Sequence, residues 1–152
     1  VLGAGMLNIG RCIAFEFSGR ISTVVTTPGT LTLDFRLGTT AIMSSGAMTL
    51  NIVAKTDTPF IFKGELVVRA VGLTTVTTFF PKSCMFISHA VIGASAVGTA
   101  GAGIQMLPYN AAPAVGTGVD FNVSQSVDLF ATWSINNANS IQVHAGHVDI
   151  YS

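Results

Sequence analysis

Charged side chains are scarce in this sequence: seven basic and seven acidic residues make up 9% of its 152 residues. Ordinary soluble domains carry about 25%. Because the two signs cancel, no long-range field attracts nucleic acid or an anionic membrane, and we expect neither as a partner. A folded monomer of this mass exposes roughly 7,300 Å², or about 500 Å² for each charge. Since 49% of the residues are apolar, we expect other subunits to cover part of this neutral surface.

Cysteine is also scarce, and no targeting signal is visible. Cys12 and Cys84 are too few for a disulfide-based fold, and we interpret them as small buried hydrophobic residues. No basic stretch precedes an apolar run at the amino end, so no signal peptide is expected. The length suits one domain with a core of its own.

Helical periodicity is missing throughout, whereas strand periodicity is frequent. The clearest example is residues 30–37, between turn signals at Pro28 and Gly38. Every second residue of this segment is apolar: Leu31, Leu33, Phe35 and Leu37. Successive side chains of a strand point to opposite faces, so the pattern predicts a strand with one buried face.

Similar patterns predict further strands, separated by turns. The predicted strands are residues 13–17, 21–25, 48–55, 60–71, 74–80, 84–92, 119–123, 127–134, 141–143 and 148–150. The predicted turns are residues 18–19, 44–46, 56–59, 81–82 and 136–139, the last as the loop of a terminal hairpin. Gly64, on the apolar face of its strand, predicts a bulge or a close backbone approach. Short strands with this punctuation predict an all-β fold: an antiparallel two-sheet β-sandwich, jelly-roll-like, with about eight strands.

Two segments lack a clear period. Residues 1–12 form an apolar amino-terminal arm, expected to lie on a neighbouring subunit. Residues 13–152 form the single domain, with an uncharged Gly/Ala-rich insertion loop at residues 93–118. A membrane-spanning helix over residues 84–104 has a suitable length, but its second half is poor in large apolar residues and it contains His89.

We therefore expect this loop to be buried between subunits, because glycine and alanine allow close approach of two backbones. The candidate interface residues are Gly93, Ala96, Val97, Gly98, Ala100, Gly101, Gly103, Ile104, Met106 and Leu107. Four charged residues lie on polar strand faces and either face solvent or set the register between subunits: Arg36, Lys63, Glu65 and Arg69.

No constellation of catalytic or metal-binding residues emerges. His144 and His147 would point to opposite faces of a strand, and no neighbouring ligands complete a metal site. No G-x-S-x-G motif marks a nucleophile, and no glycine pattern fits a dinucleotide site. Trp133 is interpreted as a core residue. We predict no enzymatic activity, no metal and no cofactor.

Four phrases of the sequence resemble surface proteins of the head or tail of tailed bacteriophages. They are TTPGTLTLDFRLGTT (26–40), SSGAMTLNIVAKTDTPF (44–60), ELVVRAVG (65–72) and FATWSINNANSIQVH (130–144). The resemblance implies a homo-oligomeric virion structural protein, with trimers common among capsid decoration (cement) proteins. It predicts a decoration subunit on the particle surface, bound to the major capsid protein or other virion proteins. The alternative is a tail-tip or fibre knob that binds a host receptor or glycan.

Overall fold

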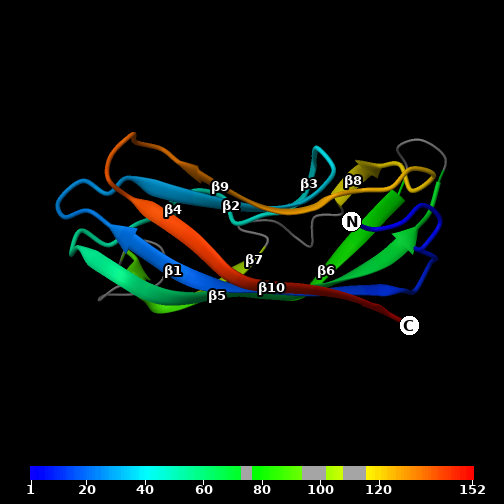
Figure 1. Cartoon of the computed structure of the whole chain (residues 1–152), viewed down its shortest axis with the longest axis horizontal. Helices are drawn as coiled ribbons and strands as arrows, with labels where there is room; N and C mark the ends of the chain where they lie inside the picture. Colours follow the sequence, from blue (N-terminus) through cyan, green and yellow to red (C-terminus); the bar gives the residue numbers. More distant parts are fainter. Residues whose placement is uncertain (73–76, 94–101, 108–115) are drawn as a thin grey trace.

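The protein is an all-β sandwich of two antiparallel sheets (Figure 1). The structure, a computed structural model, describes residues 1–72, 77–93, 102–107 and 116–152. It exposes 7568 Å², close to the area expected for a monomer of this mass. In these ranges, no helix has the length and apolarity needed to cross a membrane.

The larger sheet has six strands. Its order is β10-β1-β5-β6-β7, and β8 also pairs with β6. The strands are β1 (Cys12–Thr23), β5 (Lys55–Ala70), β6 (Thr77–Ile92), β7 (Ala102–Leu107), β8 (Gly116–Val119) and β10 (Ser140–Tyr151).

The smaller sheet has four strands around a central one. They are β2 (Thr30–Leu37), β3 (Thr40–Ser44), β4 (Met48–Thr49) and β9 (Val127–Trp133). Leu31 pairs with both Met48 and Trp133, so β4 and β9 flank β2 on opposite edges. β3 shares the edge used by β4. The described residues thus form ten strands rather than about eight, because β3 and β7 add to the predicted set.

The alternation predicted for residues 30–37 is confirmed in β2. All four of its apolar side chains are at most 1% exposed. The Phe35 ring stacks on that of Phe15 from the opposite sheet, with centroids 4.2 Å apart, and Phe15 stacks on Phe62 at 5.4 Å. The predicted apolar face of residues 60–71 also points into this core, with Phe60, Phe62, Leu66 and Val68 buried. The core is therefore the space between the two sheets.

Several predicted turns are wrong because the strands continue through them, at or beside β-bulges. Residues 18–19 lie inside the continuous strand β1, opposite a bulge at His144 of β10, so residues 13–17 and 21–23 belong to one strand. Residues 56–59 lie within β5, and residues 81–82 lie within β6. Residues 141–143 and 148–150 are likewise one strand, β10. A bulge absorbs an extra residue while the hydrogen-bonded ladder continues, and its sequence resembles that of a turn.

Two predicted strands are shorter than expected. The segment 48–55 contributes β4 and the first residue of β5, because Asn51 Oδ1 accepts a hydrogen bond from Val53 N at 3.0 Å and turns the chain away between them. Ile52 and Val53 are consequently 66% and 59% exposed. Of residues 119–123, only Val119 belongs to a strand, β8, although Phe121 remains buried in the following turn.

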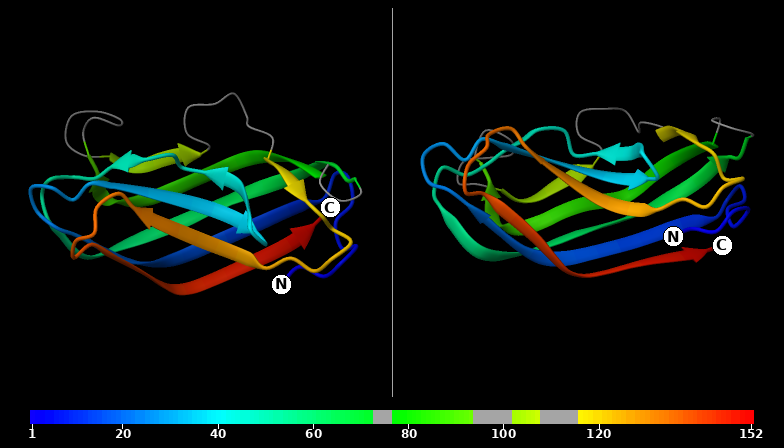
Figure 2. Two further views of the ribbon diagram at one scale, coloured as in Figure 1. Left: turned by 90° about the horizontal axis from the view of Figure 1, so that it is seen from above. Right: turned by 45° about the horizontal axis from the view of Figure 1, so that its top comes forward.

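The predicted terminal hairpin is also wrong. Residues 134–139 join β9 to β10, but β9 pairs with β2 in one sheet and β10 with β1 in the other. The loop therefore crosses between sheets, next to residues 24–29, which make the same crossing from β1 to β2 (Figure 2). Asn139 ties the two crossings together: Val24 N donates to its Oδ1 at 2.9 Å, and its Nδ2 donates to Pro28 O at 2.6 Å. The two crossings are thereby joined at one end of the sandwich.

The apolar amino-terminal arm packs on its own chain. Leu2 and Leu7 are 5% and 2% exposed and belong to the core. Leu2 forms an isolated β-bridge with Gln125, with N···O distances of 2.8 and 2.9 Å. The expectation that this arm lies on a neighbouring subunit is therefore corrected for these residues, since their apolar side chains already have intramolecular partners.

The predicted insertion loop at residues 93–118 is corrected in part. Residues 102–107 form β7 and residues 116–119 form β8, both paired with β6. Glycine and alanine have low strand propensity, so periodicity alone did not reveal these strands. The membrane helix weighed for residues 84–104 is excluded where described, because residues 84–92 belong to β6.

Candidate subunit interface

The structure divides the predicted interface residues into buried and exposed ones. Gly93 and Leu107 are buried in the chain itself, and Gly93 N donates to Thr49 O at 2.6 Å. Ile104 and Met106, by contrast, are 52% and 56% exposed on β7. Gly103, which precedes Ile104 in β7, is half-buried. The remaining predicted residues lie outside the described ranges: Ala96, Val97, Gly98, Ala100 and Gly101.

Ile104 and Met106 belong to a larger apolar surface on the outer face of the six-stranded sheet. Met106 pairs with Met85, and Ile104 pairs with Ile87. Ile61 pairs in turn with Ile87 on the next strand. We call these five residues of β5, β6 and β7 the apolar corner.

The apolar corner is suited to association. Ile61 is 37% exposed, so three of its five side chains expose more than a third of their surface. A contiguous exposed apolar patch on a soluble protein indicates an interaction site more often than a single exposed residue does. Towards β10 the same face becomes charged, with Glu16 opposite Lys63 in the next pair of strands. The outer face is therefore divided into an apolar and a charged half.

The four candidate register-setting charges do not come together. Arg36 lies on the smaller sheet, where its Nη2 contacts Asp34 Oδ2 at 2.8 Å and its guanidinium lies 3.8 Å from the Phe130 ring centroid. Lys63, Glu65 and Arg69 lie on the outer face of the larger sheet. Arg36 is thus occupied within its own chain and far from the apolar corner.

Glu65 also has intramolecular partners. Lys82 Nζ lies 3.0 Å from Glu65 Oε2. This hydrogen bond, followed by one from the Tyr151 hydroxyl, lowers the pKa of Glu65 below its ordinary value. The same bonds raise the pKa of Lys82 and of Tyr151. The cluster joins β5, β6 and β10 across the charged half of the outer face.

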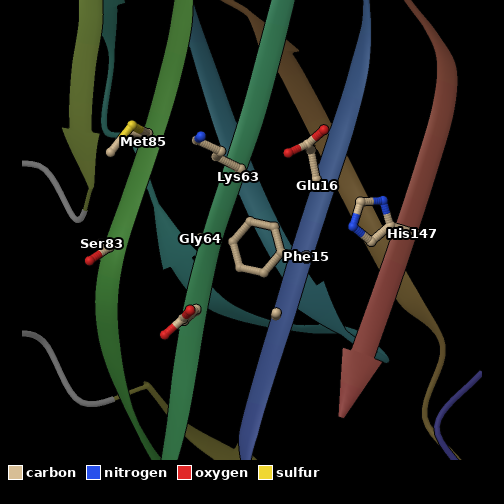
Figure 3. Close-up of a pocket in the computed structure, with 9 residues that line it drawn as sticks. Phe15, Glu16, Lys63, Gly64, Ser83, Met85 and His147 are labelled. Atoms are coloured by element: carbon tan, nitrogen blue, oxygen red, sulfur yellow. The ribbon is translucent and has the colours of Figure 1, made fainter. Parts of the chain in front are cut away.

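A shallow depression of about 350 Å³ opens on the outer face around Gly64 (Figure 3). Its rim carries Glu16, Lys63 and His147, whose side chains are seen in Figure 3 around the Phe15 ring. The bulge predicted at Gly64 lies instead in the partner strand: the β5–β6 register shifts between Lys63 and Glu65, and the extra residue is in β6, at Ser83 and Cys84.

A backbone approach accompanies this bulge. A Cβ atom on Gly64 would lie 2.8 Å from the Cα of Cys84, which the bulge turns inward. Ser83 takes the left-handed conformation there, with φ of 55°. Glycine is therefore required at position 64 by packing, as a side chain would overlap β6.

The residues with potential for chemistry are scattered. Within the described ranges, no three His, Cys, Asp or Glu side chains are grouped closely enough to hold a metal ion. His144 is the extra residue at the β10 bulge, and His147 lies 4.0 Å from Asp149. Both histidines are exposed. The depression therefore combines charged side chains without a recognisable set of catalytic or metal-ligating groups.

The two cysteines are free thiols in different environments. Cys84 is buried as predicted, whereas Cys12 is only half-buried on the outer face. Burial raises the pKa of Cys84 to about 11. A thiol with such a pKa stays protonated at neutral pH and is a poor nucleophile.

Sequence reasoning missed three of the five members of the apolar corner. Ile61, Met85 and Ile87 lie on strand faces that also carry charge or short polar residues, so each one alone looks like an ordinary surface residue. The sequence did contain one signal for an exposed apolar residue: Ile61 lies on the same strand face as Lys63 and Glu65, which is the outward face. Only strand pairing shows that these side chains are neighbours.

Comparison with known proteins finds no matching family model, no matching curated protein and no matching solved structure.

Proposed function

We propose that this chain is a non-catalytic structural subunit of a virion surface, a capsid decoration subunit that binds copies of itself and the particle. The observation that carries the proposal is the apolar corner, in a chain with only fourteen charged residues. The assignment to a phage particle is based on the resemblance of its strand and turn segments to phage surface proteins.

The free energy gained by burying the apolar corner is suited to a weak contact that is repeated over many copies. Fully burying one large aliphatic side chain stabilises by about 1.5–3 kcal/mol, so a half-exposed one contributes about 1 kcal/mol. The three residues that are more than a third exposed gain about 2–3 kcal/mol on each copy, which is less than the cost of about 4–15 kcal/mol for bringing two molecules together. A single contact of this kind is weak, but many copies held on one particle add their contacts together.

The alternative, a tail-tip or fibre knob that binds a glycan, is supported by one feature. A second depression, about 460 Å³, is lined by aromatic and amide side chains, including Phe130, Trp133 and Asn136. Aromatic faces and amides are common in small-molecule sites. Asn137 and Asn139 also line it, but their amides already donate to the carbonyls of Thr27 and Pro28. We therefore favour the decoration subunit.

Counting copies in purified particles tests the proposal. We expect quantitative mass spectrometry to find hundreds of copies of this chain for each particle. A few copies would instead indicate a tail protein, and none would refute the assignment to a virion.

The apolar corner is tested separately by light scattering. We expect Ile104→Lys to lower the mass of the native assembly, because the charge would have to be buried in the contact. Val123→Lys is the matched control, since Val123 is 54% exposed in the turn after β8, away from the apolar corner. If both variants keep the native mass, the apolar corner is not the subunit interface.

A further inference from the structure

One long side of the sandwich is open. β9 is the edge strand of the smaller sheet and β10 the edge strand of the larger one, and the two lie on the same side (Figure 2). Among the residues that the structure describes, no strand pairs with the outer edge of either. Both edges thus present unpaired backbone groups to their surroundings.

Core-facing side chains along this side are only partly covered. Leu33 and Phe35 of β2 are 0% exposed, yet the inward side chains of the neighbouring β9 are half-buried. We call the half-buried set the open seam: Phe17, Val127, Leu129, Ala131, Trp133, Ile141, Val148 and Ile150. The seam is therefore a part of the core that remains partly exposed to solvent along this side.

The edge of β10 lacks most devices that keep edge strands apart. Natural edges carry lysine, proline or inward charges, or are interrupted by bulges. β10 contains no lysine, arginine, glutamate or proline over its twelve residues. Its bulge lies at His144, so residues 145–151 form a regular strand without interruption. This segment is available for pairing along its whole length.

We propose that a second copy of this chain pairs with this edge, β10 against β10 in antiparallel orientation, with Val148 on the twofold axis. Val148 is the middle residue of the segment 145–151, so this register uses all of it. A twofold contact of identical surfaces is the commonest arrangement in homo-oligomers. The two six-stranded sheets then continue into each other.

The sequence around Val148 is complementary to itself in this register. His147 faces Asp149 of the second copy on the outer side, which pairs an imidazole with a carboxylate. On the inner side, Ile150 faces Gly146, and on the outer side Tyr151 faces Ala145. Each large side chain thus faces a small one. Asp149, the one acidic residue of the segment, faces His147 of the second copy and not the second Asp149.

The environment of Gly146 agrees with this register. The Phe17 ring covers Gly146, with its Cε1 only 2.9 Å from where a Cβ would lie. Phe17 is itself partly exposed in the seam. Ile150 of the second copy therefore gains an apolar surface made of Gly146 and Phe17. On the outer face, His147 Nε2 already lies 4.0 Å from Asp149 Oδ2 of its own chain, so the two pairs meet across the axis as a group of four in which each imidazole faces a carboxylate.

The paired part of the seam is large enough for a specific dimer. The seven paired residues 145–151 span roughly 24 Å, and two packed sheets with their side chains present a side about 20 Å wide. The product is roughly 480 Å² on each partner, or about 1,000 Å² in total, which is the lower bound for a specific interface.

This contact deepens the proposed function and rests on its self-association. The seam lies at the β10 edge of the larger sheet and the apolar corner at the β7 end. A subunit with two different contacts can extend beyond a pair, as a coat on a particle requires.

Disulfide cross-linking tests the register. In a Cys12→Ser background, Val148→Cys places the two new thiols directly opposite each other, within the range that a disulfide spans. We expect nearly complete dimer cross-linking under mild oxidation. Ile150→Cys is the matched control, because its two thiols would lie about four residues apart along the strands, roughly 13 Å. Absence of cross-linking at position 148, or equal cross-linking at 150, overturns the register.

Charge exchange provides a second test that leaves the core unchanged. We expect His147→Asp to raise the dimer dissociation constant at least about tenfold, because it opposes two carboxylates twice across the axis. The double variant His147→Asp/Asp149→His should restore dimerisation in sedimentation velocity. A native chain that is monomeric at micromolar concentration, or a double variant no better than the single one, overturns the dimer. Particle counts test the virion assignment independently of both outcomes.

Discussion

At the scale of single residues, the missing side chain of Gly64 decides the environment of Cys84. The bulge opposite Gly64 turns Cys84 inward, and its Sγ donates to the carbonyl of Glu65 at 3.3 Å. Burial in this position raises its pKa to about 11. Cys12, in contrast, lies half-buried on the outer face. The two thiols should therefore differ sharply in reactivity.

We predict that a thiol reagent at pH 8 modifies Cys12 in the native protein and Cys84 only after unfolding. The Cys84 thiol is protonated at this pH and shielded by β5, whereas Cys12 has access to solvent. Peptide mass spectrometry after alkylation measures both sites. The Cys12→Ser variant is the control and should stay unmodified until denaturant is added; rapid alkylation of Cys84 in that folded variant would contradict the structure.

At the scale of the elements, Asn139 connects two loops that are more than a hundred residues apart in sequence. Its amide accepts from Val24 N and donates to Pro28 O, while Ser134 Oγ accepts from Thr30 N at 2.8 Å. These bonds hold both crossings in register, so that β1 meets β10 and β2 meets β9 in different sheets.

We predict that Asn139→Ala lowers the free energy of unfolding by about 1–3 kcal/mol, because two partly buried backbone groups lose their partner. Chemical denaturation measures the change. Asn136→Ala is the matched control: Asn136 is exposed in the same loop, and we expect a change within about 0.5 kcal/mol. Equal effects of the two variants would mean that Asn139 does not hold the crossings together.

At the scale of the whole molecule, the Glu65 cluster joins three strands of the larger sheet and makes part of the stability dependent on pH. Lys82 and Tyr151 lower the pKa of Glu65, so the folded state favours its ionised form. The stabilisation is fully present above the ordinary glutamate pKa of 4.5. It is lost as the pH falls through the lower pKa of the folded state.

We predict that the melting temperature of the native protein falls as the pH drops below about 4.5. Glu65→Gln should weaken this dependence, since the amide cannot titrate, and should cost less stability at pH 3 than at pH 7. Thermal unfolding followed by circular dichroism at pH 3 to 7 measures both curves. An unchanged pH profile in the variant would show that other carboxyl groups control acid unfolding.

The proposed self-association belongs to the same scale. We predict that the proposed oligomer survives about 1 M NaCl, since the apolar corner and the open seam are apolar while exposed ion pairs are largely screened at this concentration. Light scattering at 0.1 and 1 M salt provides the comparison. Dissociation in high salt would indicate that charged residues of the outer face hold the subunits together.

Local periodicity was enough to predict the sandwich and much of its core. The side-chain period of a strand is two, so the alternation in residues 30–37 and 60–70 specifies which side chains are buried whatever the partner strands are. Gly64 was likewise recognisable as a place of close backbone approach, one of the two reasons for an isolated glycine within a strand. Ile104 and Met106 were among the predicted interface residues because residues 93–118 carry no charge, not because of periodicity, and their role in an interface stays a prediction.

The amino-acid sequence by itself therefore determined the all-β class, the buried faces and the shortage of charge, since each depends only on residues close together in the chain. Tertiary structure alone decided which turn signals became bulges, which loop crosses between sheets and which strands form edges, because these depend on pairing between distant segments. The apolar corner and the open seam belong to this second group. Their side chains become neighbours only when β5, β6 and β7, or β9 and β10, are brought together.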